Sequence, residues 1–250
     1  MKATIDPNLY TQIGLDSGSL TILGSIVHSL GDPGEYRVAL HHGESVEGVC
    51  FITSDNSSPV AQATVDLATL GTPPKQMGGA VTTGDKGCGC GGGGEQSSGG
   101  QHFTVNPRGY VLFRVSSGAG GYYVHVRRID ADPKDKGYDS RALGAADLFS
   151  AVVLRPGTYS VYNTLTKAKG ALVVTYPKVG EKGHVTPNPV RVVCGTGSFE
   201  PAKLQVEPGQ GIIFEAKAPS RIEIKLEKPD DGPKGSQQPS RTASRKLALK

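Results

Sequence analysis

Short apolar runs that end at glycine or proline constrain the fold of this chain more than any other feature of its sequence. Many of them alternate apolar and polar residues, as half-buried strands do, and none has the three turns of an amphipathic helix. Glycine and proline account for 35 and 17 of the 250 residues, which favours turns over long helices. We therefore predict an all-β chain, in which the best helical candidate is the short segment Asp139–Asp147.

Two stretches lack the strand pattern. Residues 78–101 are dominated by glycine, and because glycine loses much entropy when it is ordered, we predict a flexible linker there. Residues 229–250 are polar, rich in Pro, Ser and Lys, and net basic, so we predict a disordered tail. The predicted strands then fall into three segments, 1–77, 102–177 and 189–228.

Two weak internal repeats suggest how these segments combine. The motif Pro-Gly-x-Tyr-x-Val occurs at residues 33–38 and again at 156–161, and HFTVNPRGYVLF (102–113) lines up with KLQVEPGQGIIF (203–214). The middle segment carries both elements, whereas each end of the chain carries only one. Pro-Gly-x-Tyr is also ordinary in hairpins of Greek-key domains, which leaves a simpler interpretation open.

We predict two similar Greek-key sandwiches from this pattern. One is continuous over 102–177, and the other is discontinuous, with the N-terminal segment 1–77 completed by 189–228. A four-stranded fragment cannot bury its apolar face alone, so the end segments need each other or a second chain. Closure within one chain and exchange between chains both remain open.

The middle segment and the stretch GSFEPAKLQVEPGQGIIFEAKAPSRIEIKL (197–226) resemble cupredoxin-like domains, and the resemblance covers roughly half of the chain. HFTVNPRGYVLFRVSSGAGGYYVHVRRI (102–129) is similar to the opening strands of that family, and VVLRPGTYSVYNTLTKAKGALVV (152–174) is similar to its closing hairpin. The resemblance implies cupredoxin-like sandwiches. It also implies a Cys ligand four residues after the motif tyrosine, where this chain has Leu40 and Asn163. We therefore expect no blue-copper centre, which needs a Cys thiolate and two His.

Cys88-Gly89-Cys90 is the strongest local signal for metal binding. Two thiols in a glycine-rich loop can fold around a soft ion such as copper or zinc, and His102, His41 and His42 are the nearest further ligands by type. A Cys-Gly linker without ligands is the alternative interpretation. We place His41 and His42 in a hairpin loop.

The other candidate groups have simpler interpretations. Cys50 and Cys194 lie in apolar runs, so we predict buried thiols. His125 alternates with Val124 and Val126, which places it on an outward sheet face with Tyr123 and Arg127. The pattern assigns nothing to His28.

Several classes of function are disfavoured by the sequence. It contains no Gly-x-Ser-x-Gly elbow, no phosphate-binding glycine loop before a helix, and no apolar run of about 18 residues to span a membrane. The net charge of +4 lies mainly in the tail, which makes nucleic acid an improbable partner. The N-terminus lacks a secretory signal, so we expect a cytoplasmic protein.

The remaining evidence favours a non-enzymatic β-sandwich that binds a ligand or has a structural role in an assembly. A protein partner or a homo-oligomer is expected, with the basic-apolar end Ser240–Lys250 as a docking segment. A copper- or zinc-binding protein that uses the Cys-Gly-Cys loop is the alternative. An enzyme is the third hypothesis, and it requires a pocket between the two sandwiches that holds a histidine and a perturbed carboxylate.

Overall fold

A computed structural model describes residues 13–70, 100–176, 185 and 187–230 of the chain, and all statements below concern these residues. They form an all-β structure with one short helix, α2 (Leu67–Leu70), which confirms the predicted fold class. Among them there is no helix with the length and apolar character needed to cross a membrane.

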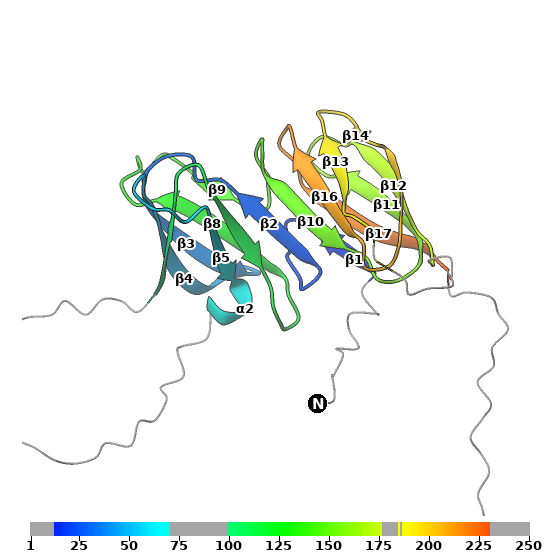
Figure 1. Ribbon diagram of the computed structural model, residues 1–250, viewed down its shortest axis with the longest axis horizontal. Coiled ribbons are helices and arrows are strands. Elements are labelled where there is room, and N and C mark those ends of the chain that lie inside the picture. Colours follow the sequence, from blue (N-terminus) through cyan, green and yellow to red (C-terminus); the bar gives the residue numbers. More distant parts are fainter. Residues whose placement is uncertain (1–12, 71–99, 177–184, 186, 231–250) are drawn as a thin grey trace, which may run out of the picture.

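The strands form one central sheet and two outer sheets (Figure 1). The central sheet has the order β14 (Phe199–Glu200), β13 (Val190–Cys194), β16 (Gly211–Ala216), β10 (Leu148–Val152), β2 (Gly24–His28), β7 (Tyr110–Arg114) and β5 (Gln62–Asp66). The first outer sheet has the order β6 (Gln101–Val105), β4 (Ser45–Ser54), β3 (Gly34–His42), β8 (Tyr122–Arg128) and β9 (Tyr138–Asp139). The second outer sheet has the order β1 (Gly14–Asp16), β17 (Ile222–Pro229), β11 (Gly157–Asn163), β12 (Lys169–Val174) and β15 (Lys203–Val206).

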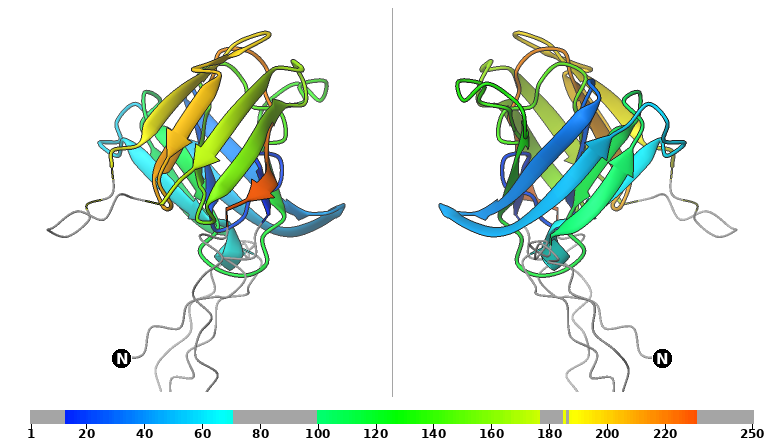
Figure 2. Two further views of the ribbon diagram at one scale, coloured as in Figure 1. Left: turned by 90° about the vertical axis from the view of Figure 1, so that its right-hand side faces the viewer. Right: turned by 90° about the vertical axis from the view of Figure 1, so that its left-hand side faces the viewer.

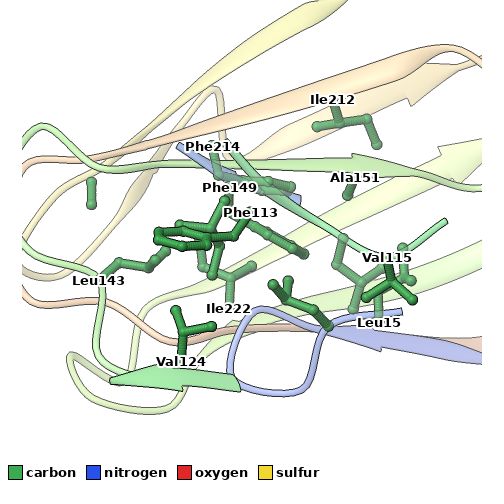
Figure 3. Close-up of a cluster of buried hydrophobic side chains, with 14 of the residues drawn as sticks. Leu15, Phe113, Val115, Val124, Leu143, Phe149, Ala151, Ile212, Phe214 and Ile222 are labelled. Atoms are coloured by element: carbon green, nitrogen blue, oxygen red, sulfur yellow. The ribbon is translucent and has the colours of Figure 1, made fainter. Parts of the chain in front are cut away.

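A continuous core fills the space between the sheets. Phe113 and Phe214 come from the central sheet, whereas Val124 and Ile222 come from the two outer sheets. All four side chains are fully buried. Figure 3 shows these side chains gathered in one cluster. The fold is therefore sandwich-like, with each outer sheet covering one half of the central sheet.

The two halves of the chain have the same strand pairing. We call β2 to β8 the first repeat and β10 to β17 the second repeat, and Figure 2 views the second repeat in its left panel and the first in its right panel. The shared pairs are β3–β4 and β11–β12, β4–β6 and β12–β15, β5–β7 and β13–β16, β2–β7 and β10–β16, and β3–β8 and β11–β17. The parallel pairs correspond as well as the antiparallel ones.

Side-chain contacts reproduce the sequence repeat. The motif tyrosines Tyr36 and Tyr159 each donate a hydrogen bond to the carbonyl oxygen four residues earlier, that of Asp32 at 2.9 Å and that of Arg155 at 2.6 Å. The strand registers also agree with the second sequence repeat, in which residue 105 lines up with residue 206. Residue 105 is level with the motif glycine at 34, and residue 206 is level with the motif glycine at 157. The two weak sequence repeats are therefore equivalent structural positions.

The two repeats meet at a local two-fold axis in the central sheet. Ile26 pairs with Phe113, and Phe149 pairs with the equivalent Phe214, so Ile26 and Phe149 occupy equivalent positions. These two residues also pair with each other across the antiparallel β2–β10 junction. Directly paired residues point to the same face of a sheet, so both outer sheets cover the same face of the central sheet.

The strand partners correct the predicted domain boundaries. Strands β3 and β4 pair with β8 and β6, and strands β10 to β12 pair with strands of the segment 189–228. The predicted continuous sandwich 102–177 is therefore divided between the two repeats. Completion of 1–77 by 189–228 is wrong for every described strand except β1, which pairs with β17.

A polar contact favours this pairing over the predicted one. Asn163 is fully buried, its Nδ2 donates to Ser220 Oγ at 2.9 Å, and its Oδ1 accepts the Arg221 N–H at 3.2 Å. The equivalent residue of the first repeat, Leu40, faces Val124 in an apolar core. The β11–β12 hairpin placed against the first repeat would leave the Asn163 amide buried without those partners, which is costly.

Of the other predicted segments, one is wrong and two lie largely outside the described residues. The segment Asp139–Asp147 is not a helix, because it contains β9, turns and Ala146 at a φ of 73°. Residues 78–99 of the predicted linker and 231–250 of the predicted tail, Ser240–Lys250 included, lie outside the described residues. β17 extends to Pro229, so the predicted tail begins inside a strand.

The shared central sheet predicts that both repeats unfold together. Phe149→Ala empties a fully packed position on the two-fold axis and should lower the free energy of unfolding by about 3–5 kcal/mol, in a single transition. Urea unfolding followed by circular dichroism measures both quantities. Phe51→Ala, on the half-buried outward side of β4, should cost less. Two separate transitions would contradict a common core.

Burial also predicts inert thiols at two cysteines. Cys50 and Cys194 are free and fully buried, and burial raises the pKa of each thiol to about 12, with Glu215 contributing at Cys194. Because the thiolate is the reactive form, a Cys88→Ser/Cys90→Ser variant should react with a disulfide reagent at about pH 8 only after unfolding. Rapid labelling of two thiols in the folded variant would be inconsistent with this packing.

Candidate functional site

A large cleft lies on the outward face of the first outer sheet and has a volume of about 1060 Å³. Its floor is formed by Arg37 and His41 from β3 and by His125 and Arg127 from β8. Its wall is formed by the connection 129–147, which leads from the first repeat to the second. The cleft therefore exists because this connection runs beside an exposed sheet face.

Strand alternation explains why these side chains share a face. Val124 and Val126 of β8 are buried in the core, so Tyr123, His125 and Arg127 point outward, as predicted. The register of β3 against β8 places its outward residues 37, 39 and 41 opposite residues 127, 125 and 123. His41 and His42 lie at the end of β3, so their predicted placement in a hairpin loop is wrong.

Aromatic rings form a platform at one end of the cleft. The ring of His41 stacks on Tyr123 with centroids 4.8 Å apart and an interplanar angle of 12°, and His125 meets His41 edge-on at 5.4 Å. The Arg141 guanidinium lies over the Tyr123 ring, 4.3 Å from its centroid. The Tyr123 hydroxyl donates to the carbonyl oxygen of Gly43 at 3.0 Å, which fixes the ring further.

One carboxylate links the platform to the wall. Asp139 Oδ2 lies 3.1 Å from His125 Nε2 and 2.7 Å from Arg141 Nη2, while Oδ1 accepts from Arg141 Nε at 3.1 Å. Burial acts to raise the pKa of Asp139, but hydrogen bonds from Arg141 and His125 outweigh it, and the pKa lies below its usual value. Asp139 is therefore ionised at neutral pH and compensates the charge of Arg141.

His41 remains neutral at the same pH. Burial lowers its pKa below 6.5, and the neighbouring His125 and Arg141 lower it further, although Asp139 acts in the opposite direction. Its Nδ1 is inaccessible and has no hydrogen-bond partner among the described residues. The platform thus offers an uncharged ring beside the cationic groups of the cleft.

A further histidine, His28, lies at the junction of the repeats. The sequence pattern assigned no role to it. His28 Nδ1 lies 2.7 Å from Asp147 Oδ1, and Asp147 Oδ2 accepts the Gly144 N–H at 2.6 Å. The His28 ring also stacks on Tyr138 at 3.7 Å, beside a smaller pocket of about 460 Å³. Since Asp147 directly precedes β10, this contact ties the connection to β2 and holds the cleft wall in place.

The predicted metal ligands do not come together within the described residues. Cys88 and Cys90 lie outside them. His102 stacks on Phe51 and pairs with it. Phe51 in turn pairs with Arg37, which lies about 13 Å along β3 from His41, so His102 and His41 are far apart. His42 turns to the other face and lies 3.1 Å from Glu47.

No described group of three His, Cys, Asp or Glu side chains is arranged to hold a metal ion. The sequence pattern had identified Tyr123, His125 and Arg127 but not Asp139 or Arg141, which it placed in a helix. These two join the cleft because β9 returns to pair with β8. The pairing of β9 with β8 brings together side chains that lie apart in the sequence, and no local sequence pattern indicates it.

The lowered pKa of His41 predicts a loss of stability in mild acid. Below about pH 6.5 the unfolded chain takes up a proton at this ring that the folded protein resists, so the free energy of unfolding should fall as the pH decreases. NMR titration of the His41 ring, assigned with a His41→Gln variant, should give a midpoint below 6.5. A midpoint at or above 6.5 would show that the ring is not desolvated as described.

Comparison of the chain with protein-family models, with curated proteins and with solved structures gave no match. The geometry and chemistry of the cleft are therefore the basis on which a function can be inferred.

Proposed function

We propose that this protein is a non-enzymatic binding module built from two cupredoxin-like sandwiches, and that the cleft of the first repeat is its ligand site. The volume of about 1060 Å³ is at the upper end of the range in which proteins hold small organic molecules, about 300–1,000 Å³. The similarity to cupredoxins is supported by the Pro-Gly-x-Tyr hairpins and by the parallel pairs β4–β6 and β12–β15.

The pre-formed platform is the observation that carries this proposal. His41 stacks on Tyr123, the Arg141 guanidinium lies over the same Tyr123 ring, and Asp139 fixes Arg141 by accepting its hydrogen bond. Rings held in this way can receive a flat ligand with little further loss of conformational entropy. The groups are binding groups, and none of them is an activated nucleophile.

The repeat structure explains why the site occurs once. The wall belongs to the connection between the repeats, and a chain of two repeats has one such connection. We therefore assign ligand binding to the first repeat and a supporting role to the second. The expected protein partner and cytoplasmic location stay predictions.

A ligand screen by NMR tests the proposed function. The full chain is mixed with glucose, glucuronate, citrate, inorganic phosphate and butylamine, and the ring signals of His41, Tyr123 and His125 are followed. At least one compound should shift them, and Tyr123→Ala should weaken its binding about fivefold or more, because His41 and Arg141 lose the ring that holds them in place.

Tyr110→Ala provides the matched control, because Tyr110 is 40% exposed on the central sheet and hydrogen-bonds to Gln62 away from the cleft. It should leave the affinity unchanged. Absence of shifts with every compound, or an affinity that is unchanged in Tyr123→Ala, would refute the cleft as the binding site.

A further inference from the structure

We propose that the ligand of the cleft is an organic oxyanion, carrying carboxylate, phosphate or sulfate groups, and that Arg37 and Arg127 recognise it. This inference rests on the proposed function and adds the chemical class of the ligand. It is drawn from the charges of the cleft and from the equivalent positions of the second repeat.

Two arginines face each other directly on the cleft floor. Arg37 of β3 and Arg127 of β8 are cross-strand partners, so their Cβ atoms lie about 5 Å apart on the same face. Like charges in this arrangement destabilise a sheet unless something compensates them. Arg127 donates to the backbone carbonyl of Asp132 at 3.0 Å, which satisfies one donor without neutralising its charge.

Arg37 has no hydrogen-bond or ion-pair partner among the described residues. Apart from its two histidines, the cleft is lined by four basic and two acidic side chains, which gives it a net charge of +2. One of the two acids, Asp139, is already engaged by Arg141 and His125. Of the remaining lining residues, Lys136 and Asp135 offset each other in charge, which leaves the two charges of the Arg37–Arg127 pair in excess.

The second repeat shows that the fold does not require these arginines. Alignment of the motif tyrosines makes Ser160 equivalent to Arg37, and the pairing of β11 with β17 makes Lys225 equivalent to Arg127. Lys225 Nζ lies 2.6 Å from Glu223 Oε2, and Ser160 Oγ donates to Glu227 at 2.6 Å. The same cross-strand position is thus charge-compensated in one repeat and uncompensated in the other.

Guanidinium chemistry identifies the ligand class. Two planar forks with free N–H donors match the paired oxygens of carboxylate, phosphate or sulfate, and such charge-assisted bonds are stronger than neutral ones. The neighbouring uncharged ring of His41, held by its stacking on Tyr123, provides a surface for the organic part of the molecule. A neutral sugar or an amine has no groups that compensate the two arginines.

Calorimetric titration of the full chain with citrate and with inorganic phosphate tests the proposal and separates the two sources of oxyanion. Arg37→Ala and Arg127→Ala should each weaken binding about tenfold to hundredfold. Lys225→Ala, the equivalent change in the second repeat, should alter it less than twofold. Arg37→Lys should restore only part of the affinity, since a lysine keeps the charge but loses the fork.

Urea unfolding supplies a second readout that does not depend on heat of binding. The anion should raise the urea midpoint of the wild-type protein, and sodium chloride at equal ionic strength should not. The arginine variants should lose this protection, and without anion Arg37→Ala should unfold at a urea concentration no lower than that of the wild type. Equal protection by sodium chloride would show that the stabilisation comes from ionic screening of charges and not from anion binding, and it would overturn the proposal.

The failures of the two proposals are distinguishable. Binding of glucose or butylamine that depends on Tyr123 but not on Arg37 or Arg127 would leave the cleft as a site and refute the oxyanion. Binding of no compound at all would refute both.

Discussion

The antiparallel pairing of β2 with β10 is the interaction on which the rest of the structure depends. It places Ile26 opposite Phe149, its own equivalent, and so joins two similar halves into one seven-stranded sheet. An isolated half would expose this strand edge, which is a liability in any sheet protein. The pairing therefore closes two edges at once and makes the cores of both halves continuous.

The proposed binding site lies where this symmetry is broken. The connection from β8 to β10 has to travel between the repeats, and on its way it provides β9, Asp139 and Arg141 beside one outward sheet face. The contact between His28 and Asp147 then anchors the end of this connection to β2. A nearly symmetric scaffold thus acquires this cleft on its first repeat, and the second repeat serves as an internal reference for what the fold alone requires.

Part of this arrangement could be predicted from the sequence, and the limits have physical causes. Strand alternation correctly placed His125 on an outward face, and apolar context correctly placed Cys50 and Cys194 in the core. The helix at Asp139–Asp147 was wrong because a short, unsupported helix is only marginally stable, and this segment instead begins with Asp139 in β9 and continues in turns. The metal hypothesis brought together histidines that lie at different levels of the sheet.

The sequence by itself determined the all-β class, the two motif repeats and the faces of the strands, because each follows from local periodicity and turn chemistry. Only the tertiary structure decided which hairpin completes which half. The two hairpins have similar apolar patterns, so hydrophobic burial alone distinguishes them poorly, and the buried hydrogen bonds of Asn163 favour one pairing. The charge of the cleft was likewise a tertiary outcome, because Arg37 and Arg127 are distant in sequence and become neighbours only when β3 pairs with β8.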